Sequence, residues 1–359
     1  MRVQVMTDAV ANDLVSRGAV LEQFHGLALP AHFGDPEREW RAARGGAAAF
    51  PAAYRRLIAA TGADRAEFLQ GMLTNDVKAL VPGTGCYAAQ LNQTGKVITD
   101  LRVYADAERM WLDVVAWRAA LMREQLERFI IADDVELTEI EQVQPLIHLE
   151  GPTAAAVAGE VLGLDALPAT PFAHQAVTFN GRAVEVANAS ETGIGGVLIW
   201  GAPASTGPLL DACREAGAVP AGMRALDMLR IEAGVPWPGI DMDETTLIME
   251  IGLDPAISFS KGCYLGQELV ERVSARGHVN RVLRGLVLEA GAVPAPRAPV
   301  LLDDREVGYA TSAARSPLLE RPIALTVMQR KHAAPGTRVH VGASPATVAE
   351  LPFSAPPDS

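Results

Sequence analysis

The chain carries the run Arg56-Leu57-Ile58-Ala59-Ala60-Thr61-Gly62, and a helical pattern starts near Asp64 directly after it. The apolar run predicts a short buried strand, Gly62 a tight turn, and Phe68, Leu69 and Met72 the inward face of the helix. The unit recurs, because Leu57-Ile58 with Gly62 and Ala66 overlays Leu146-Ile147 with Gly151 and Ala155 at one constant offset. Chance similarity remains an alternative. A true repeat predicts two related α+β modules that share an interface.

Between the two units, apolar alternation predicts strands at 86–91, 97–104, 110–115 and 135–140, with a helix at 117–131. After the second unit we expect a hairpin turning at Asn180-Gly181, a strand at 196–200, and helices at 209–216 and 224–233. From Arg284 onward, short apolar runs separated by Pro, Gly and Asp-Asp predict a small antiparallel barrel or sandwich. The fold class is therefore α+β.

These patterns divide the chain into segments. We predict a lead-in segment (1–50), a first α+β module (51–144), a second module (145–284), a C-terminal β-barrel (285–353) and a disordered tail (354–359).

Composition narrows the function. Hydrophobic residues make up 49% and charged residues 21%, which is typical of a globular protein, and no apolar run is long enough to span a bilayer. With no targeting segment in sight, we expect a cytoplasmic protein. The net charge of −12 argues against general nucleic-acid binding. The basic stretch from Arg272 to Arg284 is either a solvated helix end or an anion funnel.

The three cysteines stand far apart at Cys86, Cys213 and Cys263, so neither a disulfide framework nor a self-contained metal site is expected. Cys263 lies in the run Lys261-Gly262-Cys263-Tyr264-Leu265-Gly266-Gln267-Glu268. We predict a helix from Tyr264 to Arg276, N-capped by Ser260 and ended by Gly277. In its first turn Cys263 would gain thiolate character. The alternative is a tight structural turn with a buried thiol.

Taken together, these residues resemble the YgfZ-type folate-binding proteins, factors in tRNA modification and iron–sulfur assembly that are related to the glycine-cleavage aminomethyltransferase (T-protein). The run from Lys261 to Glu268 is the most specific element. The supporting runs are Phe68-Leu69-Gln70-Gly71 with Thr74-Asn75-Asp76-Val77, Leu91-Asn92 with Gly95-Lys96 and Asp100, Arg230-Ile231-Glu232-Ala233-Gly234-Val235-Pro236, Tyr309-Ala310-Thr311-Ser312 with Ser316-Pro317, and Leu351-Pro352-Phe353. The resemblance covers about residues 50–353.

The resemblance implies two α+β modules and a barrel around a central tetrahydrofolate site. It also implies support for assembly or repair of iron–sulfur clusters in client enzymes, with those enzymes or assembly proteins as partners. By motif match Cys263 is the functional thiol and Lys261 its cationic neighbour. Carboxylates and amides suit a pterin edge, and arginine suits a glutamate tail. The expected folate-binding residues are Asn92, Asp100, Arg230, Glu232, Glu250 and Gln267.

Each of these residues has a structural alternative. Asn92 also fits the start of the turn Asn92-Gln93-Thr94-Gly95. Arg230 and Glu232 stand two apart on a helix and do not face each other, so one of them fits an ordinary surface charge.

A second function stays open, namely a folate-dependent aminomethyltransferase or demethylase that moves a one-carbon unit from an amine to tetrahydrofolate. Against it, the adjacent aspartates of the T-protein relatives are here Thr99-Asp100, so one carboxylate is missing. The run Thr192-Gly193-Ile194-Gly195-Gly196-Val197-Leu198 also lacks the acidic residue of those relatives. A third possibility is a scaffold that has lost its ligand. Whether the protein is an enzyme therefore stays open, and a maturation factor is the favoured prediction.

Overall fold

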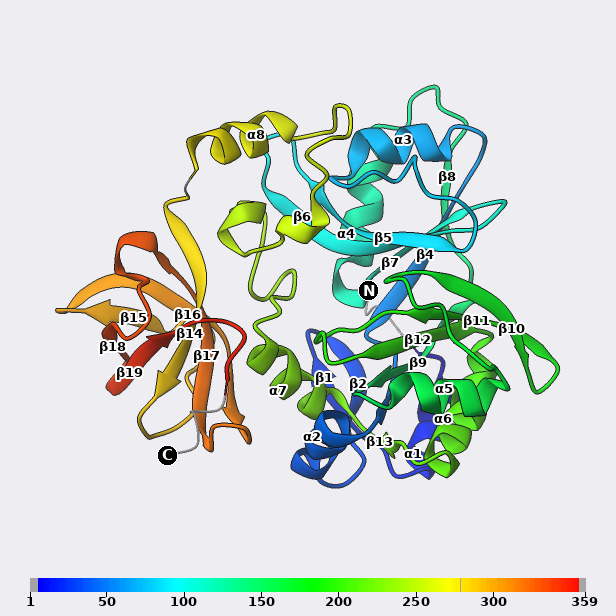
Figure 1. Cartoon of the computed structure of the whole chain (residues 1–359), viewed down its shortest axis with the longest axis horizontal. Coiled ribbons are helices and arrows are strands. Elements are labelled where there is room, and N and C mark those ends of the chain that lie inside the picture. Colours follow the sequence, from blue (N-terminus) through cyan, green and yellow to red (C-terminus); the bar gives the residue numbers. More distant parts are fainter. Residues whose placement is uncertain (1–5, 278, 355–359) are drawn as a thin grey trace. The chain divides into compact units, whose positions relative to one another are not determined.

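The computed structural model describes residues 6–277 and 279–354 (Figure 1). It comprises two compact units. The first consists of the chain up to Gln90 together with Thr99–Leu226 and Ser258–Tyr264. The second consists of Leu91–Ile98, Asp227–Ile257 and the chain from Leu265 onward.

A five-stranded antiparallel sheet in the order β5-β6-β7-β4-β8 forms the first module of unit one. Its elements are β4 (Arg55–Thr61), α3 (Arg65–Met72), β5 (Thr84–Leu91), β6 (Val97–Ala105), β7 (Met110–Val115), α4 (Ala116–Glu127) and β8 (Glu136–Glu139). The strands and helices predicted for this part of the sequence are confirmed, with ends shifted by a few residues, as is usual for element boundaries.

A six-stranded sheet in the order β10-β11-β12-β9-β3-β13 forms the second module. Its elements are β3 (Ala48–Pro51), β9 (Gln144–Glu150), α5 (Ala154–Leu162), β10 (His174–Phe179), β11 (Arg182–Asn188), β12 (Gly196–Gly201), η1 (Pro203–Ser205), α6 (Thr206–Glu215) and β13 (Val219–Pro220). The predicted hairpin is confirmed, since Phe179 pairs with Arg182 and the two turn residues Asn180 and Gly181 have positive φ.

The two sheets have the same topology. In each, a central strand is followed by a helix, three consecutive antiparallel strands, a second helix and a final strand, and β3 is the one insertion. The turn after each central strand needs glycine. A Cβ atom at Gly62 (φ +98°) would lie 1.9 Å from the carbonyl oxygen of Asp134, and one at Gly151 (φ +129°) would lie 2.3 Å from that of Gly46. The predicted internal repeat is confirmed.

The N-terminal part of unit one holds two helices and a hairpin: α1 (Asp8–Ser16), β1 (Val20–Phe24), β2 (Leu27–His32) and α2 (Pro36–Gly45). Thr7 and Asp35 accept hydrogen bonds from the backbone at the starts of α1 and α2, as N-caps do.

Unit two contains a closed six-stranded antiparallel barrel in which β19 pairs back onto β14. Its strands are β14 (Arg281–Leu288), β15 (Pro299–Leu302), β16 (Arg305–Ser316), β17 (Arg321–Gln329), β18 (Arg338–Val341) and β19 (Ser344–Ala349), with η4 (Arg330–His332) after β17. Buried aliphatic side chains such as Leu286, Val300 and Met328 fill its interior. The α+β fold with a C-terminal antiparallel barrel is therefore confirmed.

Four further helical elements lie along the chain between β13 and β14: α7 (Met223–Ala233), η2 (Ile248–Glu250), η3 (Asp254–Ala256) and α8 (Gln267–Arg276). The helix predicted from Tyr264 was wrong at its start, because Gly266 has φ +82° and α8 begins only after it. Its predicted end is confirmed, since Gly277 is a left-handed C-cap.

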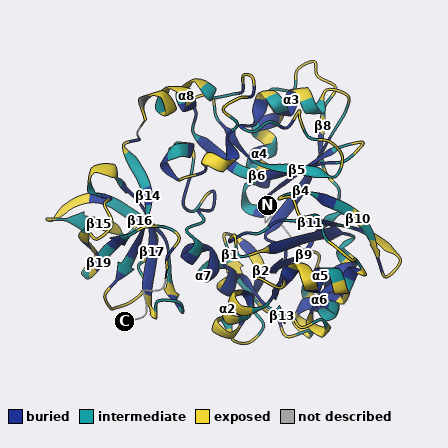
Figure 2. Cartoon of the chain, in the orientation of Figure 1, coloured by how far each residue is buried: buried dark blue, intermediate teal, exposed yellow. Residues whose placement is uncertain are grey.

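Buried residues concentrate along the strands of both sheets and of the barrel, whereas exposed residues follow loops and outer helix faces (Figure 2). Among the described residues, no helix combines the length and the apolarity needed to cross a bilayer. The predicted tail lies outside the described residues except for Ser354.

Candidate functional site

Strand β6 presents polar side chains toward the second module of unit one. Asp100, Arg102 and Tyr104 alternate along this strand and therefore share one face of the sheet. Asp100 is half-buried, and its Oδ2 accepts a hydrogen bond of 2.6 Å from the hydroxyl of Tyr87 on β5. The ring of Tyr87 stacks on that of Phe172, with 6.3 Å between the ring centroids. An acid and two aromatic faces thus lie together.

The protonation of this pair is perturbed. Burial raises the pKa of Asp100, while the Tyr87 hydrogen bond and Arg55 act in the opposite direction. Burial also raises the pKa of Tyr87 well above its usual value, with Asp100 adding to the effect. Asp100 is therefore suited to hold and release a proton nearer neutrality than an exposed aspartate is.

Two buried arginines lie beside this pair. Arg55 on β4 donates from Nε to Asp113 Oδ1 at 2.6 Å. Arg102 lies 3.4 Å from Asp113 Oδ2. Asp113, on β7, is fully buried. One carboxylate therefore offsets only one of the two positive charges.

The second compensating charge comes from the other module. Glu191, in the loop between β11 and β12, lies 3.0 Å from Arg55 Nη1 and 2.9 Å from Arg102 Nη2. The hydroxyl of Tyr54 also donates to it at 3.2 Å. Burial opposes its charge, but Arg102 and Arg55 outweigh burial and lower the pKa of Glu191 to about 2. Glu191 is thus ionised at neutral pH and joins the two modules.

Glu150 at the end of β9 holds the Glu191 loop in place. Its carboxylate accepts from the Ser190 hydroxyl at 3.0 Å, from the Thr192 hydroxyl at 2.7 Å and from the backbone N–H of Glu191. His148 lies two residues before Glu150 on the same strand. Its Nε2 donates to the carbonyl oxygen of Ala189 at 2.9 Å, and its Nδ1 shares a hydrogen bond of 2.6 Å with Tyr54.

Five buried charged residues of this cluster were missed by the sequence analysis: Arg55, Arg102, Asp113, Glu150 and Glu191. The available signal was the presence of charges inside otherwise apolar strand patterns, as in 97–104 and 110–115. A buried charge needs a partner. The run 192–198 contains no carboxylate, yet Glu191, directly before it, supplies one.

Lys261, expected as the cationic neighbour of Cys263, has its ammonium group bound at the end of α3. Its Nζ donates to the carbonyl oxygens of Gln70 and Leu73 at 2.6 Å and of Asn75 at 2.8 Å. Gln70 lies in the last turn of α3 and Leu73 is its C-cap, where carbonyls lack intrahelical partners, and Asn75 lies in the segment that follows. Lys261 thus caps α3 with all three ammonium hydrogens. Burial lowers its pKa to about 8, although Asp76 and Cys86 oppose the shift.

Cys263 is exposed, and it precedes α8 rather than lying in its first turn. Cys263 therefore lies outside the first turn, in which the helix dipole was expected to act on it. The alternative of a buried thiol is also wrong. Burial raises the pKa of the Cys86 and Cys213 thiols to about 12 each. Cys263 is accordingly the accessible thiol of the described residues.

The other predicted folate residues belong to unit two. Arg230 is buried, donates to Asp227 and Asp241 at 2.7 Å each, and lies over Trp237 at 4.5 Å. Its Nη2 donates to Ser312 on β16 at 2.7 Å. Arg230 therefore anchors the end of α7 to the barrel, and the surface-charge alternative is wrong for it.

Glu232 is also buried and accepts a hydrogen bond of 2.5 Å from the hydroxyl of Ser316. Glu250 forms an ion pair of 2.9 Å with Arg281 and accepts from the backbone N–H of Leu247. Both carboxylates thus have partners inside unit two.

Asn92 Oδ1 accepts from the backbone N–H groups of Thr94 and Lys96, which confirms the turn interpretation. Gln267 is the first residue of α8, and its amide donates to Glu271 at 2.6 Å. Among the predicted residues, Asp100 is the one that lies in the buried charge cluster.

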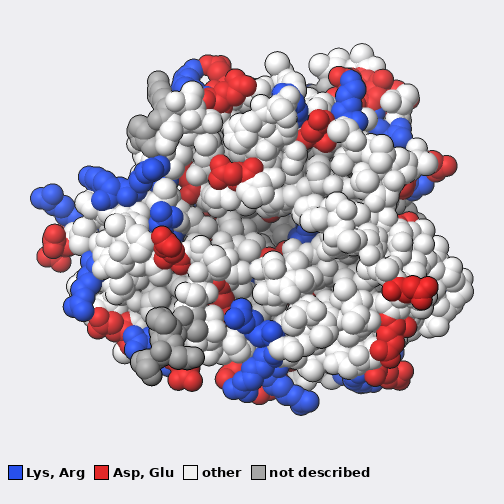
Figure 3. All heavy atoms as spheres, viewed as in Figure 1, with Lys and Arg blue, Asp and Glu red and all other residues white. Residues whose placement is uncertain are grey.

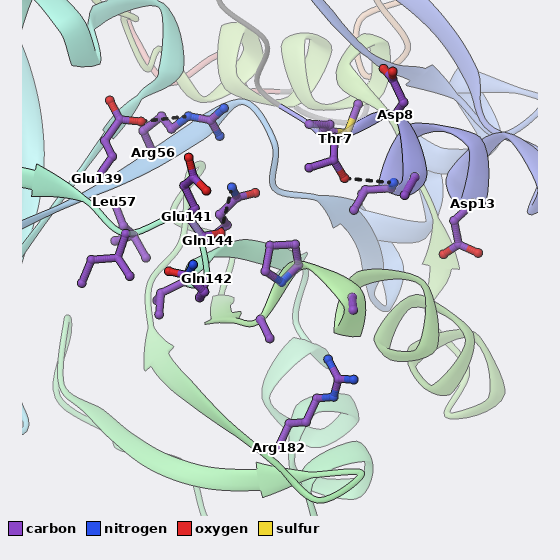
Figure 4. Close-up of a pocket in the computed structure, with 18 of the residues that line it drawn as sticks. Thr7, Asp8, Asp13, Arg56, Leu57, Glu139, Glu141, Gln142, Gln144 and Arg182 are labelled. Atoms are coloured by element: carbon purple, nitrogen blue, oxygen red, sulfur yellow. Dashed lines mark hydrogen bonds and ion pairs between the residues drawn. The ribbon is translucent and has the colours of Figure 1, made fainter.

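A cavity of about 1080 Å³ lies elsewhere in unit one, lined by α1, by Arg56 and Leu57 of β4, by the segment 139–144 and by Arg182 (Figure 4). None of the charged residues of the Asp100 cluster lines it. Acidic and basic side chains are interspersed over both units on the face drawn in Figure 3. No group of three or more His, Cys, Asp or Glu side chains in the described part of the chain could hold a metal ion.

Residues 10–261 match the GCVT N-terminal domain, and residues 281–354 match the glycine cleavage T-protein C-terminal barrel domain. The chain belongs to the glycine-cleavage T-protein family. Both repeated modules lie within the first match and the closed barrel within the second.

Curated relatives of this T-protein family agree over nearly the whole length. The chain is 30% identical over 351 residues to an aminomethyltransferase of Streptomyces avermitilis, with 94% of each chain covered. It is 31% identical to an aminomethyltransferase of Chlorobium phaeovibrioides, with 94% and 96% covered. The crystal structure of aminomethyltransferase T from Bartonella henselae matches with a TM-score of 0.87 at 23% identity, covering 96% of this chain and 97% of that one. It shares the fold.

Proposed function

We propose that this chain binds tetrahydrofolate and transfers to it a one-carbon unit from an aminomethyl donor, with Asp100 as the acid–base group. Aminomethyltransferases of this family use tetrahydrofolate as the one-carbon acceptor. The observation that carries the proposal is the half-buried Asp100 carboxylate, whose raised pKa suits proton transfer.

The residues around Asp100 fit a pterin chemically. The ring edge of a pterin alternates hydrogen-bond donors and acceptors, for which a carboxylate is a good partner, and its face stacks on aromatic rings. Asp100 keeps accessible surface, the half-buried Tyr87 is bonded to it, and the half-buried Phe172 stacks on Tyr87. When bound, the folate would supply the nitrogen that receives the carbon.

Asp100 would work without a second aspartate. The neighbouring position is Thr99, which is fully buried and donates its hydroxyl to the backbone carbonyl of Asp100 at 2.9 Å. Thr99 therefore fixes the strand at Asp100 and moves no proton. The departing amine needs a proton and the accepting nitrogen loses one, so a single carboxyl group serves both steps in turn.

The test is methylene-tetrahydrofolate formation from an aminomethyl donor, together with calorimetric titration by tetrahydrofolate. We expect saturable binding, and Asp100→Asn should lower the transfer rate by about 10²–10⁴-fold while leaving the affinity within a few-fold. Transfer that survives this substitution would contradict the role of Asp100. The absence of folate binding would overturn the whole proposal.

One observation favours a second candidate, a folate-dependent maturation factor for iron–sulfur enzymes. The loop 258–264 is fixed by Lys261 and by a hydrogen bond from Ser258 N–H to Thr74 O, yet it exposes Cys263 and Phe259. A fixed loop with an accessible thiol suits transient contact with a client's cluster or thiol adduct.

Cells lacking this protein give the test of that candidate. The wild-type chain and Cys86→Ser should restore iron–sulfur enzyme activity, whereas Cys263→Ser should fold normally and fail. Full rescue by Cys263→Ser would remove the thiol from the function.

A further inference from the structure

Glu191 holds a position that the chemistry proposed for Asp100 does not itself explain. It belongs to the second module, but its side chain ends among three donors of the first module: Tyr54, Arg55 and Arg102. Glu150 fixes the Glu191 loop through three hydrogen bonds. A carboxylate held this firmly, and 7% exposed as a residue, is placed for an electrostatic task.

The charges around Asp100 define that task. Asp100 accepts a hydrogen bond from the Tyr87 hydroxyl on β5. The Arg55 guanidinium on β4 favours the ionised form of Asp100 electrostatically, and the Glu191 carboxylate in the β11–β12 loop opposes it. Arg102 also acts on Tyr87, the hydrogen-bond partner of Asp100. Buried arginines favour an ionised aspartate, and they would do so strongly here if Asp113 alone opposed them.

We propose that Glu191 is a positioning residue: it binds Arg55 and Arg102, cancels their positive charge beside Asp100, and so keeps Asp100 able to hold a proton for chemistry on a bound folate. This inference rests on the proposed function for its purpose. The electrostatic coupling itself is a property of the chain alone and can be measured without any ligand.

Removing the negative charge of Glu191 and removing the positive charge of Arg55 should shift the titration midpoint of Asp100 in opposite directions. Glu191→Gln keeps the shape of the side chain and leaves the arginines undercompensated, so Asp100 should titrate at lower pH. Arg55→Gln leaves Glu191 in excess, so Asp100 should titrate at higher pH. A substitution that merely loosened the fold would not produce two opposite shifts.

The experiment is a ¹³C NMR titration of full-length protein labelled at the aspartate side-chain carboxyl carbon. The Asp100 resonance is assigned by its absence in Asp100→Asn. We expect Glu191→Gln to lower the Asp100 midpoint by about one pH unit and Arg55→Gln to raise it by a similar amount. The control is Glu185→Gln, because Glu185 lies on β11 of the same sheet and pairs with His174 at 3.1 Å. It should leave the midpoint unchanged.

The outcomes separate this inference from the proposed function. An unchanged or raised midpoint in Glu191→Gln overturns the inference, as does an equal shift in Glu185→Gln. If Glu191→Gln fails to fold, Arg55→Gln decides, and the absence of an upward shift overturns the inference. A failure to bind tetrahydrofolate would contradict the proposed function and leave the titration result standing. If transfer activity is found, its acid limb should move to lower pH in Glu191→Gln by the same amount as the midpoint.

Discussion

Tyr87 donates its phenolic hydrogen to Asp100 across neighbouring strands β5 and β6, with 2.6 Å between the two oxygens. This bond favours the ionised carboxylate and partly offsets the effect of burial. We therefore expect Tyr87→Phe to raise the Asp100 titration midpoint by roughly one pH unit. The labelled-aspartate titration measures it. A lower midpoint would show that the bond acts on the protonated form instead.

The C-terminal end of α3 depends on Lys261. Lys261→Met keeps the aliphatic stem and removes all three hydrogen-bond donors, which leaves the carbonyls of Gln70, Leu73 and Asn75 without this partner. We expect a loss of roughly 1–3 kcal/mol in the free energy of unfolding, measured by urea denaturation. The neighbouring Cys263→Ser serves as control and should stay within about 0.5 kcal/mol, because Cys263 is exposed. Equal effects of the two variants would refute the capping role.

The turn glycine of the first repeat offers a matched comparison. Gly62 and Gly18 share φ +98°, but a Cβ at Gly62 would overlap the backbone of Asp134, whereas one at Gly18 would meet nothing within 4 Å. Gly18→Ala should cost about 1–2 kcal/mol from backbone strain alone. Gly62→Ala should cost clearly more or prevent folding, as thermal unfolding would report. Similar costs at both positions would argue against a close approach at Gly62.

Low pH should weaken the ion pairs by which Glu191 of the second module binds Arg55 and Arg102 of the first. Because the pKa of Glu191 lies near 2, below its usual 4.5, its stabilising contribution is complete above about pH 4.5 and is lost as the pH falls toward 2. The raised pKa of Asp100 acts with the opposite sign. The stability gap between wild type and Glu191→Gln should therefore narrow by about 1–2 kcal/mol between pH 6 and pH 3. Urea midpoints at several pH values measure this gap, and a constant gap would contradict the ion pairs.

Arg230 should prove structural. It is buried and bonded to Asp227, Asp241 and Ser312, so Arg230→Ala leaves the buried carboxylate of Asp241 and the partly buried one of Asp227 without their cation. We expect a loss of about 3–5 kcal/mol in the free energy of unfolding. Arg315→Ala, an exposed arginine on β16 of the same barrel, should change it by less than about 0.5 kcal/mol. A stable Arg230→Ala protein that loses only folate affinity would restore Arg230 as a ligand residue.

Local patterns carried most of the fold prediction. The strand, glycine and helix around Gly62 follow from apolar periodicity and turn chemistry, which act over a few residues, and the same holds for the Asn180-Gly181 hairpin. The predicted start of α8 was wrong because the prediction used only this local periodicity. Gly266 in a left-handed conformation, packed closely against the backbone of Asn92, ends the preceding loop, and the helical pattern at Tyr264 does not reveal it.

The site was predicted less completely, because its partners are distant in sequence. Arg55 and Glu191 are 136 residues apart, and Lys261 and Leu73 are 188 apart. A motif identifies residue types at fixed spacing, so it could nominate Asp100 and Lys261. It could not show that Asp100 lies beside two arginines or that Lys261 caps a helix, because those partners are distant in sequence.

Periodicity, turn residues and ordered motifs along the chain were enough to predict the two repeated α+β modules, the barrel and the family resemblance. Three features became visible only in the folded chain: Glu191 compensates Arg55 and Arg102, Lys261 caps α3, and Cys263 is exposed. Burial and charge pairing depend on which distant segments come into contact when the chain folds, and no local stretch of sequence determines those contacts.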